Sequence, residues 1–321
     1  MARAAAAALL VFIGPLLQAQ RVPPPLPSRA DDLLAVGRLA AAEQELYAAV
    51  AANPRQPAPR GALARYLASR ARFRIAEVLY EEALRFGADT ALIARALVEM
   101  VPYQPRTDLR SIPGVRLPSA VAAREDTRTR RGYVFSLDGP EVTVPITLTE
   151  DGRTLARFQV RGARGLIWVT IDPAATGLAI SSAGDSAIIV QTFGGHGPGA
   201  PVLIREVWVG ERSLAWLDAT IDPTVPPGEL RMGLDVLWRL RPVIDERVGT
   251  MTLPLVSARP EASPRAVRVP FVLRFPGLWL VVRPGAAPIA IEGPQGRAML
   301  RGTRWQMDPE TSTVIIVATL G

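Results

Sequence analysis

The chain has 321 residues, of which 49% are hydrophobic and 21% charged, so it is long enough for two folded domains and too apolar for extensive disorder. The formal net charge is +7, but every cation is arginine and none is interleaved with aromatic residues in a nucleic-acid motif, so no nucleic-acid partner is expected. Cysteine is absent and His196 is the single histidine, so we expect no disulfide, no metal site and no cofactor.

The first twenty residues have the layout of a secretory signal peptide. A positive charge at Arg3 precedes an apolar core from Ala4 to Leu17, and the small residue Ala19 follows. This core is too short for an ordinary membrane span. We therefore expect a secreted or periplasmic protein with no stable membrane span, and an uncleaved membrane anchor is the alternative. Residues 21–29, with four prolines, are expected to form a linker.

Residues 30–100 have helical spacing and an internal repeat. The segment Ala40–Val50 aligns with Arg74–Leu84 at an offset of 34 residues, which is the period of tetratricopeptide repeats. The region resembles about two such repeats followed by a further first helix, Thr90–Met100. A generic helical array without a ligand is the alternative. Residues 101–130 are rich in proline and lack periodicity, so they are expected to be a second linker.

From residue 131 onward the pattern is that of β-strands. Val142–Leu148 and Thr154–Val160 alternate around a polar turn, which predicts a hairpin. The stretch Gly165–Ile180 holds two apolar runs separated by Asp172 and small residues, and predicts two strands joined by a turn. The glycine-rich stretch Phe193–Ala200 lies between two further apolar runs, and Arg231–Leu253 predicts a short amphipathic helix that leads into another hairpin.

In this order, these features resemble the retropepsin-like aspartic peptidases. That family has an Asp-containing turn, a glycine-rich flap, a Gly-Leu-Asp helix and a closing strand pair. The resemblance implies a multidomain chain, α then β: the tetratricopeptide-like array, then an all-β retropepsin-like barrel over residues 131–256. Residues 257–321 are interpreted as a C-terminal β extension, or as a degenerate second lobe.

The resemblance assigns the catalytic position to Asp172 and substrate binding to the flap residues Phe193, Gly194, Gly195, His196 and Gly197. Aspartic peptidases need two carboxylates that share a proton, and a retropepsin obtains the second from a symmetric partner. Here Pro173 and Ala174 stand where the family has a hydroxyl residue and glycine. Two functions remain open: a degenerate peptidase that binds a peptide or protein, or an active aspartic-type endopeptidase that uses Asp172 in a homodimer.

The C-terminal region offers a third arrangement. Leu280–Ile291 can be aligned without gaps to Val169–Ile180, which puts Arg283 at the position of Asp172. If the chain forms an intramolecular pseudo-dimer in this alignment, we expect an ion pair between Asp172 and Arg283 across two facing turns, in place of the catalytic dyad.

Overall fold

The computed structural model describes residues 29–100, 103, 139–175, 177–181, 189–193, 197–255, 264–274 and 277–317. The predicted signal peptide lies outside these residues, as do Gly194, Gly195 and His196 of the predicted flap. None of the helices in the described ranges combines the length and hydrophobicity that crossing a bilayer requires.

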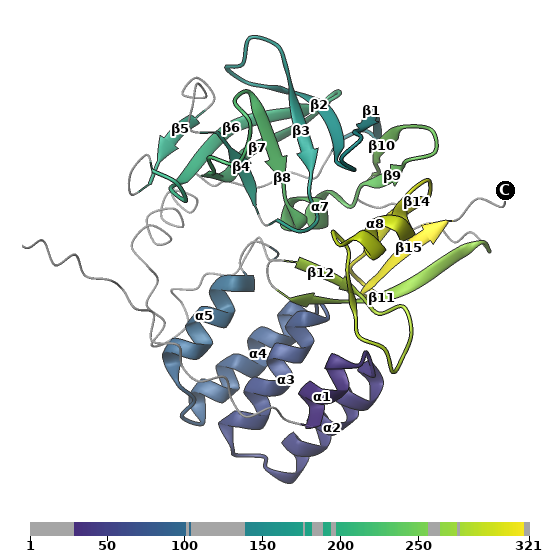
Figure 1. The fold of residues 1–321 in the computed structure, drawn as a ribbon. Coiled ribbons are helices and arrows are strands. Elements are labelled where there is room, and N and C mark those ends of the chain that lie inside the picture. Colours follow the sequence, from purple (N-terminus) through teal and green to yellow (C-terminus); the bar gives the residue numbers. More distant parts are fainter. Residues whose placement is uncertain are drawn as a thin grey trace, which may run out of the picture.

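The N-terminal part is helical, as the spacing predicts (Figure 1). Its helices are α1 (Arg29–Ala35), α2 (Leu39–Ala52), α3 (Pro57–Ser69), α4 (Phe73–Arg85) and α5 (Thr90–Met100). The aligned alanines Ala42 and Ala76 are fully buried, because a small side chain lets neighbouring helices approach closely. The assignment of these helices to tetratricopeptide repeats stays a prediction.

A large mixed β-sheet follows, and two short helices accompany it. Its first part comprises β1 (Val142–Leu148), β2 (Thr154–Val160), β3 (Leu166–Ile171), β4 (Leu178–Ile180), β5 (Ile189–Thr192), β6 (Pro201–Val209), β7 (Arg212–Ile221), β8 (Glu229–Met232), helix α7 (Leu234–Leu240), β9 (Val243–Asp245) and β10 (Thr250–Leu253). Its second part comprises β11 (Ala266–Arg274), β12 (Gly277–Leu280), β13 (Ile289–Ala290), helix α8 (Pro294–Leu300), β14 (Arg304–Asp308) and β15 (Thr313–Val317). The strand order is β13-β12-β11-β15-β14-β9-β10-β1-β2-β3-β8-β4-β7-β6-β5, and only β3–β8 and β4–β7 are parallel pairs.

The two parts of the sheet repeat one pattern. β1 and β11 both contain Val-x-Val-Pro, with Pro145 and Pro270 at the equivalent position. Pro145 pairs with Thr250, the first residue of β10, and Pro270 pairs with Thr313, the first residue of β15. The same residue types therefore meet in the same register in both parts.

The hairpins β9–β10 and β14–β15 extend the repeat. Asp245 and Asp308 each end the first strand, and each accepts a hydrogen bond of 3.1 Å from the backbone N–H two residues later. Just before the second strand, Gly249 and Ser312 both have positive φ, at 68° and 53°. Serine rarely adopts this left-handed conformation, so its presence at the matched position marks a shared turn geometry rather than a chance alignment.

We refer to residues 142–253 as the first copy and to residues 266–317 as the second copy. Each contains a short helix, α7 or α8, that begins directly after a glycine in extended conformation, Gly233 or Gly293. The copies meet where β9 pairs with β14, and there Val243 lies opposite its own equivalent, Gln306. A local two-fold axis therefore passes between these two residues, within one chain.

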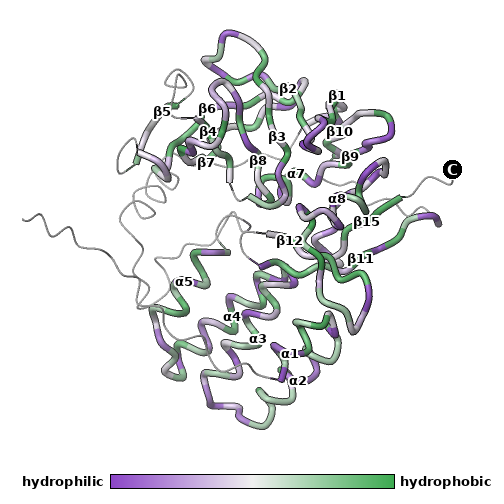
Figure 2. Tube along the Cα trace, in the orientation of Figure 1, coloured by the Kyte–Doolittle hydropathy of each residue, from purple (hydrophilic) through white to green (hydrophobic). Residues whose placement is uncertain are grey.

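The helical array packs against the junction of the two copies. Phe73 of α4, Trp238 of α7 and Tyr103 contact one another, and Trp238 also contacts Phe271 of β11; the ring centroids of these pairs lie 5.3–6.0 Å apart. In Figure 2, hydrophobic residues predominate along β11, which contributes Phe271 to this contact.

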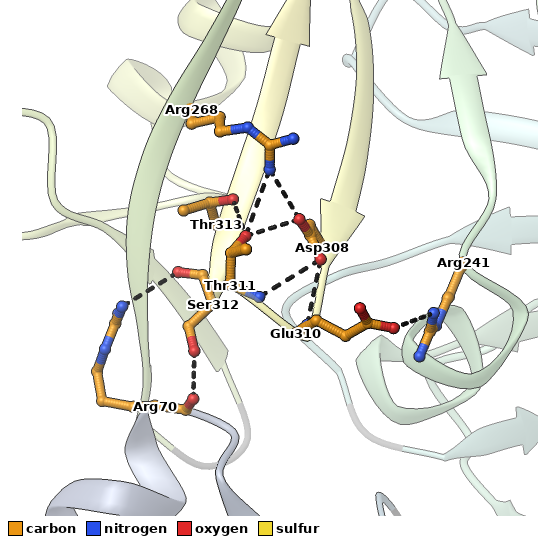
Figure 3. A network of polar contacts seen from close by, with 8 residues as sticks. All are labelled: Arg70, Arg241, Arg268, Asp308, Glu310, Thr311, Ser312 and Thr313. Carbon is orange, nitrogen blue, oxygen red and sulfur yellow. Dashed lines mark hydrogen bonds and ion pairs between the residues drawn. The ribbon is translucent and has the colours of Figure 1, made fainter. Parts of the chain in front are cut away.

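Polar contacts join the same surfaces (Figure 3). Arg70, which follows α3, donates to the Ser312 carbonyl at 3.3 Å, and the Ser312 hydroxyl donates back to the Arg70 carbonyl. In the same turn, Asp308 accepts from Arg268 at 2.8 Å and from Thr311 at 2.7 Å. Burial opposes the ionisation of Asp308, but these hydrogen bonds outweigh it and hold the pKa of Asp308 below its usual value.

Candidate functional site

Asp172 lies directly after β3, at the start of a tight turn. Its backbone N–H donates to the Met232 carbonyl at 2.9 Å, which continues the parallel pairing of β3 with β8. Its Oδ1 accepts the Ala174 N–H at 3.0 Å. An aspartate that bonds the amide two residues on is the expected behaviour of an Asp-Pro turn opener. The turn therefore holds the carboxylate without the hydroxyl group that the family places next to it.

The start of helix α7 is hydrogen-bonded to this turn. The backbone N–H groups of Gly233 and Leu234 donate to the carbonyls of Gly177 and Ala175, each at 2.7 Å. The carboxylate of Asp235, in the first turn of α7, accepts the Gly177 N–H. Asp235 is buried, and burial raises its pKa above the usual range despite these hydrogen bonds. Asp235 therefore has a structural role at the base of the Asp172 turn.

The cation beside Asp172 is Arg231 of β8. Its Nε lies 3.9 Å from Asp172 Oδ2, and its guanidinium also pairs with the carboxylate of Asp222, the residue after β7. A third contact of 3.2 Å reaches the Thr224 hydroxyl. Hydrogen bonds from the hydroxyl and backbone N–H of Thr224, together with Arg231, lower the pKa of Asp222 to about 2. Arg231 thus bridges two aspartates.

The sequence patterns did not single out Arg231 or Asp222 as site residues. A signal was present, because Ile-Asp-Pro occurs twice, at residues 171–173 and 221–223. In both cases a strand ends in an Asp-Pro turn: β3 ends before Asp172, and β7 ends before Asp222. In the sheet these two strands are separated by β8 and β4, in the order β3-β8-β4-β7. The sequence alone does not reveal that the two turns share one arginine.

The expected ion pair between Asp172 and Arg283 is not formed, which corrects the alignment that predicted it. Arg283 lies in the connection from β12 to β13, and this connection docks on the helical array instead. There the Gly285 N–H donates to the Val36 carbonyl at 2.8 Å, and the Arg283 carbonyl lies beside Gly37. The correspondence of β1 to β11 and of the β9–β10 hairpin to the β14–β15 hairpin also gives a different equivalence between the copies.

The predicted flap is a hairpin, but its described residues are held to the sheet. Phe193 is buried at 4% exposure, and its N–H donates to the Pro201 carbonyl at 2.8 Å. The Gly199 N–H donates to the Ile221 carbonyl at 2.7 Å, next to Asp222. Gly197 is exposed. Phe193 therefore packs into the core, so of the flap positions that the structure describes only Gly197 is presented to solvent.

A pocket of about 360 Å³ opens beside Asp172 and Pro173. One wall is formed by the first copy, through the turn between β1 and β2 and the turn after β9. The opposite wall is formed by the second copy, through α8 and the residues just before and after it. Its lining includes the ionisable residues Glu150, Asp151, Asp172, Glu246, Glu292, Arg297 and Arg301.

Glu246 is a partly buried carboxylate in the lining of this pocket. Burial raises its pKa, although the Gly302 N–H donates to its Oε2 at 3.2 Å. Within the described ranges, no group of three or more His, Asp or Glu side chains is arranged to hold a metal ion. The acidic side chains therefore line the pocket separately and do not converge on one point.

No family model matches the sequence, and no curated protein does. Among solved structures, the chain is similar to a retropepsin-like aspartic protease from Rickettsia conorii, with 16% sequence identity. The match covers 38% of this chain and 95% of that protein, with a TM-score of 0.28. A likeness at this level only hints at a retropepsin-like fold. We therefore infer the function from the geometry of the site.

Proposed function

We propose that this protein is a retropepsin-like protein without peptidase activity that binds an extended peptide or protein segment in the cleft beside Asp172. One observation carries the proposal. Between β2 and β8 the first copy has residues 161–228, which include Asp172, whereas between β12 and β13 the second copy has only residues 281–288. The second copy therefore has no counterpart of β3 to β7, and no counterpart of the Asp172 turn.

The chemistry of peptide hydrolysis requires more than one carboxylate. In an aspartic dyad one carboxyl group activates water while the other protonates the substrate, and each depends on a proton that the two share. Among the described residues, no carboxylate is hydrogen-bonded to Asp172, and the charged group nearest its Oδ2 is the guanidinium of Arg231. An arginine has no proton to share near neutral pH, so Arg231 cannot take the place of a second carboxyl group.

A homodimer would be the other source of a second aspartate. A symmetric dimer places the same element of each chain against its counterpart at the two-fold axis. Here one side of β9 pairs with β10 and the other side pairs with β14 of the same chain, where Val243 lies opposite Gln306. The second copy thus occupies the place that a partner chain would take, which disfavours the endopeptidase alternative.

Several features favour binding of an extended segment. The pocket beside Asp172 is of a size that can enclose a side chain, and it lies between two walls of backbone and side chains from separate copies. An extended chain that lies along a sheet edge gains backbone hydrogen bonds and offers alternate side chains to such pockets. In this proposal the helical array is a second docking surface, and the Met1–Gln20 segment directs the protein to the periplasm or outside the cell.

Peptide binding can be tested with pools of random decapeptides carrying a fluorophore, added to the purified full chain. We expect saturable binding, followed by fluorescence anisotropy, with chemical-shift changes at the amides of Ala174, Ala175 and Gly302. Absence of binding by any pool, or shift changes confined to surfaces away from these amides, would overturn the proposal.

A further inference from the structure

Resting on the proposed function, we propose that the pocket beside Asp172 receives a cationic side chain of the bound segment, an arginine or a lysine. The pocket combines apolar walls, an excess of carboxylates and two glutamates that form no ion pair with any residue that the structure describes. Each of these three features is independent of the catalytic question.

The first feature is the shape and polarity of the walls. Ile171, Pro173, Ile291 and Leu300 line a pocket of about 360 Å³, together with Leu148 and Trp305. Arginine and lysine have long aliphatic stems that pack on apolar surface while the charged end reaches a polar group. A pocket that combines apolar side chains with carboxylates is therefore complementary to both the aliphatic stem and the charged end of such a side chain.

The second feature is the sign of the charge. The lining contains five carboxylates and two arginines, so it is acidic although the whole chain carries a formal net charge of +7. This local excess opposes the overall field of the protein, which would otherwise repel a cation. An anionic ligand would meet the carboxylates at close range.

The third feature is the availability of the carboxylates. Asp151 is paired with Arg153 at 2.8 Å, and Asp172 has Arg231. By contrast, neither Glu246 nor Glu292 forms an ion pair with any residue that the structure describes, and Oε2 of Glu292 is buried and accepts no hydrogen bond there. Because Glu292 is only partly buried as a residue, rotation about its side-chain bonds would present this oxygen to the pocket.

The two arginines of the lining form no ion pair with Glu246 or Glu292 among the described residues. Arg297 and Arg301 are exposed, and Arg297 donates to the Asp151 carbonyl at 3.4 Å. This contact joins α8 of the second copy to the β1–β2 turn of the first, so Arg297 spans the two walls. The charge of Arg301 acts on Glu246 and favours its ionised form, which is the form that a cationic ligand would bind.

The test compares isosteric side chains on the wild-type chain. Five decapeptide pools are made that are random except for a fixed central residue: arginine, lysine, citrulline, norleucine or glutamate. Citrulline matches arginine in shape but carries no charge. We expect the arginine and lysine pools to bind at least about tenfold more tightly than the citrulline pool, since charge-assisted hydrogen bonds exceed neutral ones by about this factor.

A paired variant assigns the preference to the pocket. In Glu246→Gln/Glu292→Gln the ratio between the arginine and citrulline pools should fall to about one, while Glu211→Gln, at an exposed turn outside the pocket, should leave it unchanged. Equal binding of all pools to the wild-type chain would overturn the cationic pocket but leave peptide binding intact. Preference for the glutamate pool would overturn it as well.

A small probe keeps the two proposals separate if no pool binds. N-acetyl-arginine amide is titrated into the wild-type chain, with N-acetyl-citrulline amide as the control. A shift of the Gly302 amide, which is bonded to Glu246, with the arginine compound alone would support the pocket although the peptide-binding function had failed. Equal or absent shifts with both compounds would overturn it.

Discussion

Arg231 Nε lies 3.9 Å from Asp172 Oδ2, and the same guanidinium pairs with Asp222. Asp172, which the sequence resemblance assigns to a catalytic position, therefore belongs to a cluster of two carboxylates and one arginine. This arrangement is the reverse of a dyad, in which two carboxyl groups share a proton and no cation stands between them. The cluster stabilises the two Asp-Pro turns that flank β8 and β4.

The cluster can be tested through the pKa of Asp222. Replacing Thr224 by valine should raise this pKa from about 2, because the Thr224 hydroxyl is the largest single cause of its depression, and Arg231→Met should raise it as well, because it removes a hydrogen bond and a positive charge. Carbon-detected titration of the Asp222 carboxyl group measures both. An unchanged pKa in either variant would contradict the corresponding contact.

The same depression makes stability depend on pH. A carboxyl group whose pKa is lower in the folded chain stabilises the fold above its unfolded pKa of about 4, and this contribution is lost as the pH falls toward 2. Asp222→Asn should therefore have a lower melting temperature than the wild-type chain at neutral pH. The difference between the two melting temperatures should become smaller as the pH approaches 2. A difference that does not change with pH would show that the carboxylate charge is not responsible.

Asp235 should behave in the opposite way, since burial raises its pKa. Its ionised form is disfavoured in the folded chain, so Asp235→Asn, which keeps an acceptor for the Gly177 N–H, should preserve or increase stability at neutral pH. This gain should shrink as the pH falls toward the ordinary aspartate range. Asp235→Ala leaves the Gly177 N–H without its acceptor and should cost about 1–3 kcal/mol in the free energy of unfolding. Urea unfolding of the two variants at two pH values provides the comparison.

Trp238 connects the helical array to the Asp172 turn. It lies on α7, whose first residues bond that turn, and its ring meets Phe73 and Phe271 at 5.9 and 5.7 Å. Trp238→Ala should lower the free energy of unfolding by about 3–5 kcal/mol, because it leaves a large cavity. Trp238→Phe should cost less. A change to alanine that left unfolding unaltered would mean that the array and the sheet do not share this core.

Much of the fold could be predicted from local patterns. Alternation of apolar residues placed β1 and β2 at their observed bounds, and helical spacing placed the helices of residues 30–100. These are short-range properties, because side-chain periodicity is fixed by the backbone geometry of each element. The same reasoning placed Asp172 at a strand end.

The site itself depended on long-range pairing, which local patterns do not contain. Arg231 reaches Asp172 only because β8 inserts between β3 and β4. Arg283 was misplaced because its apolar flanks aligned with those of Asp172, whereas the connection that carries it docks on α1. The repeat of β1 in β11 is visible in the letters Val-x-Val-Pro, but its meaning required the register against Thr250 and Thr313.

In our proposal, the second copy completes the sheet without completing a catalytic dyad. A cleavage assay by mass spectrometry tests this, with a diverse peptide mixture incubated with the full chain from mildly acidic to neutral pH. We predict no cleavage above that of a blank, and the same result for Asp172→Asn. Cleavage by the wild-type chain that Asp172→Asn abolishes would contradict the claim and establish an active peptidase.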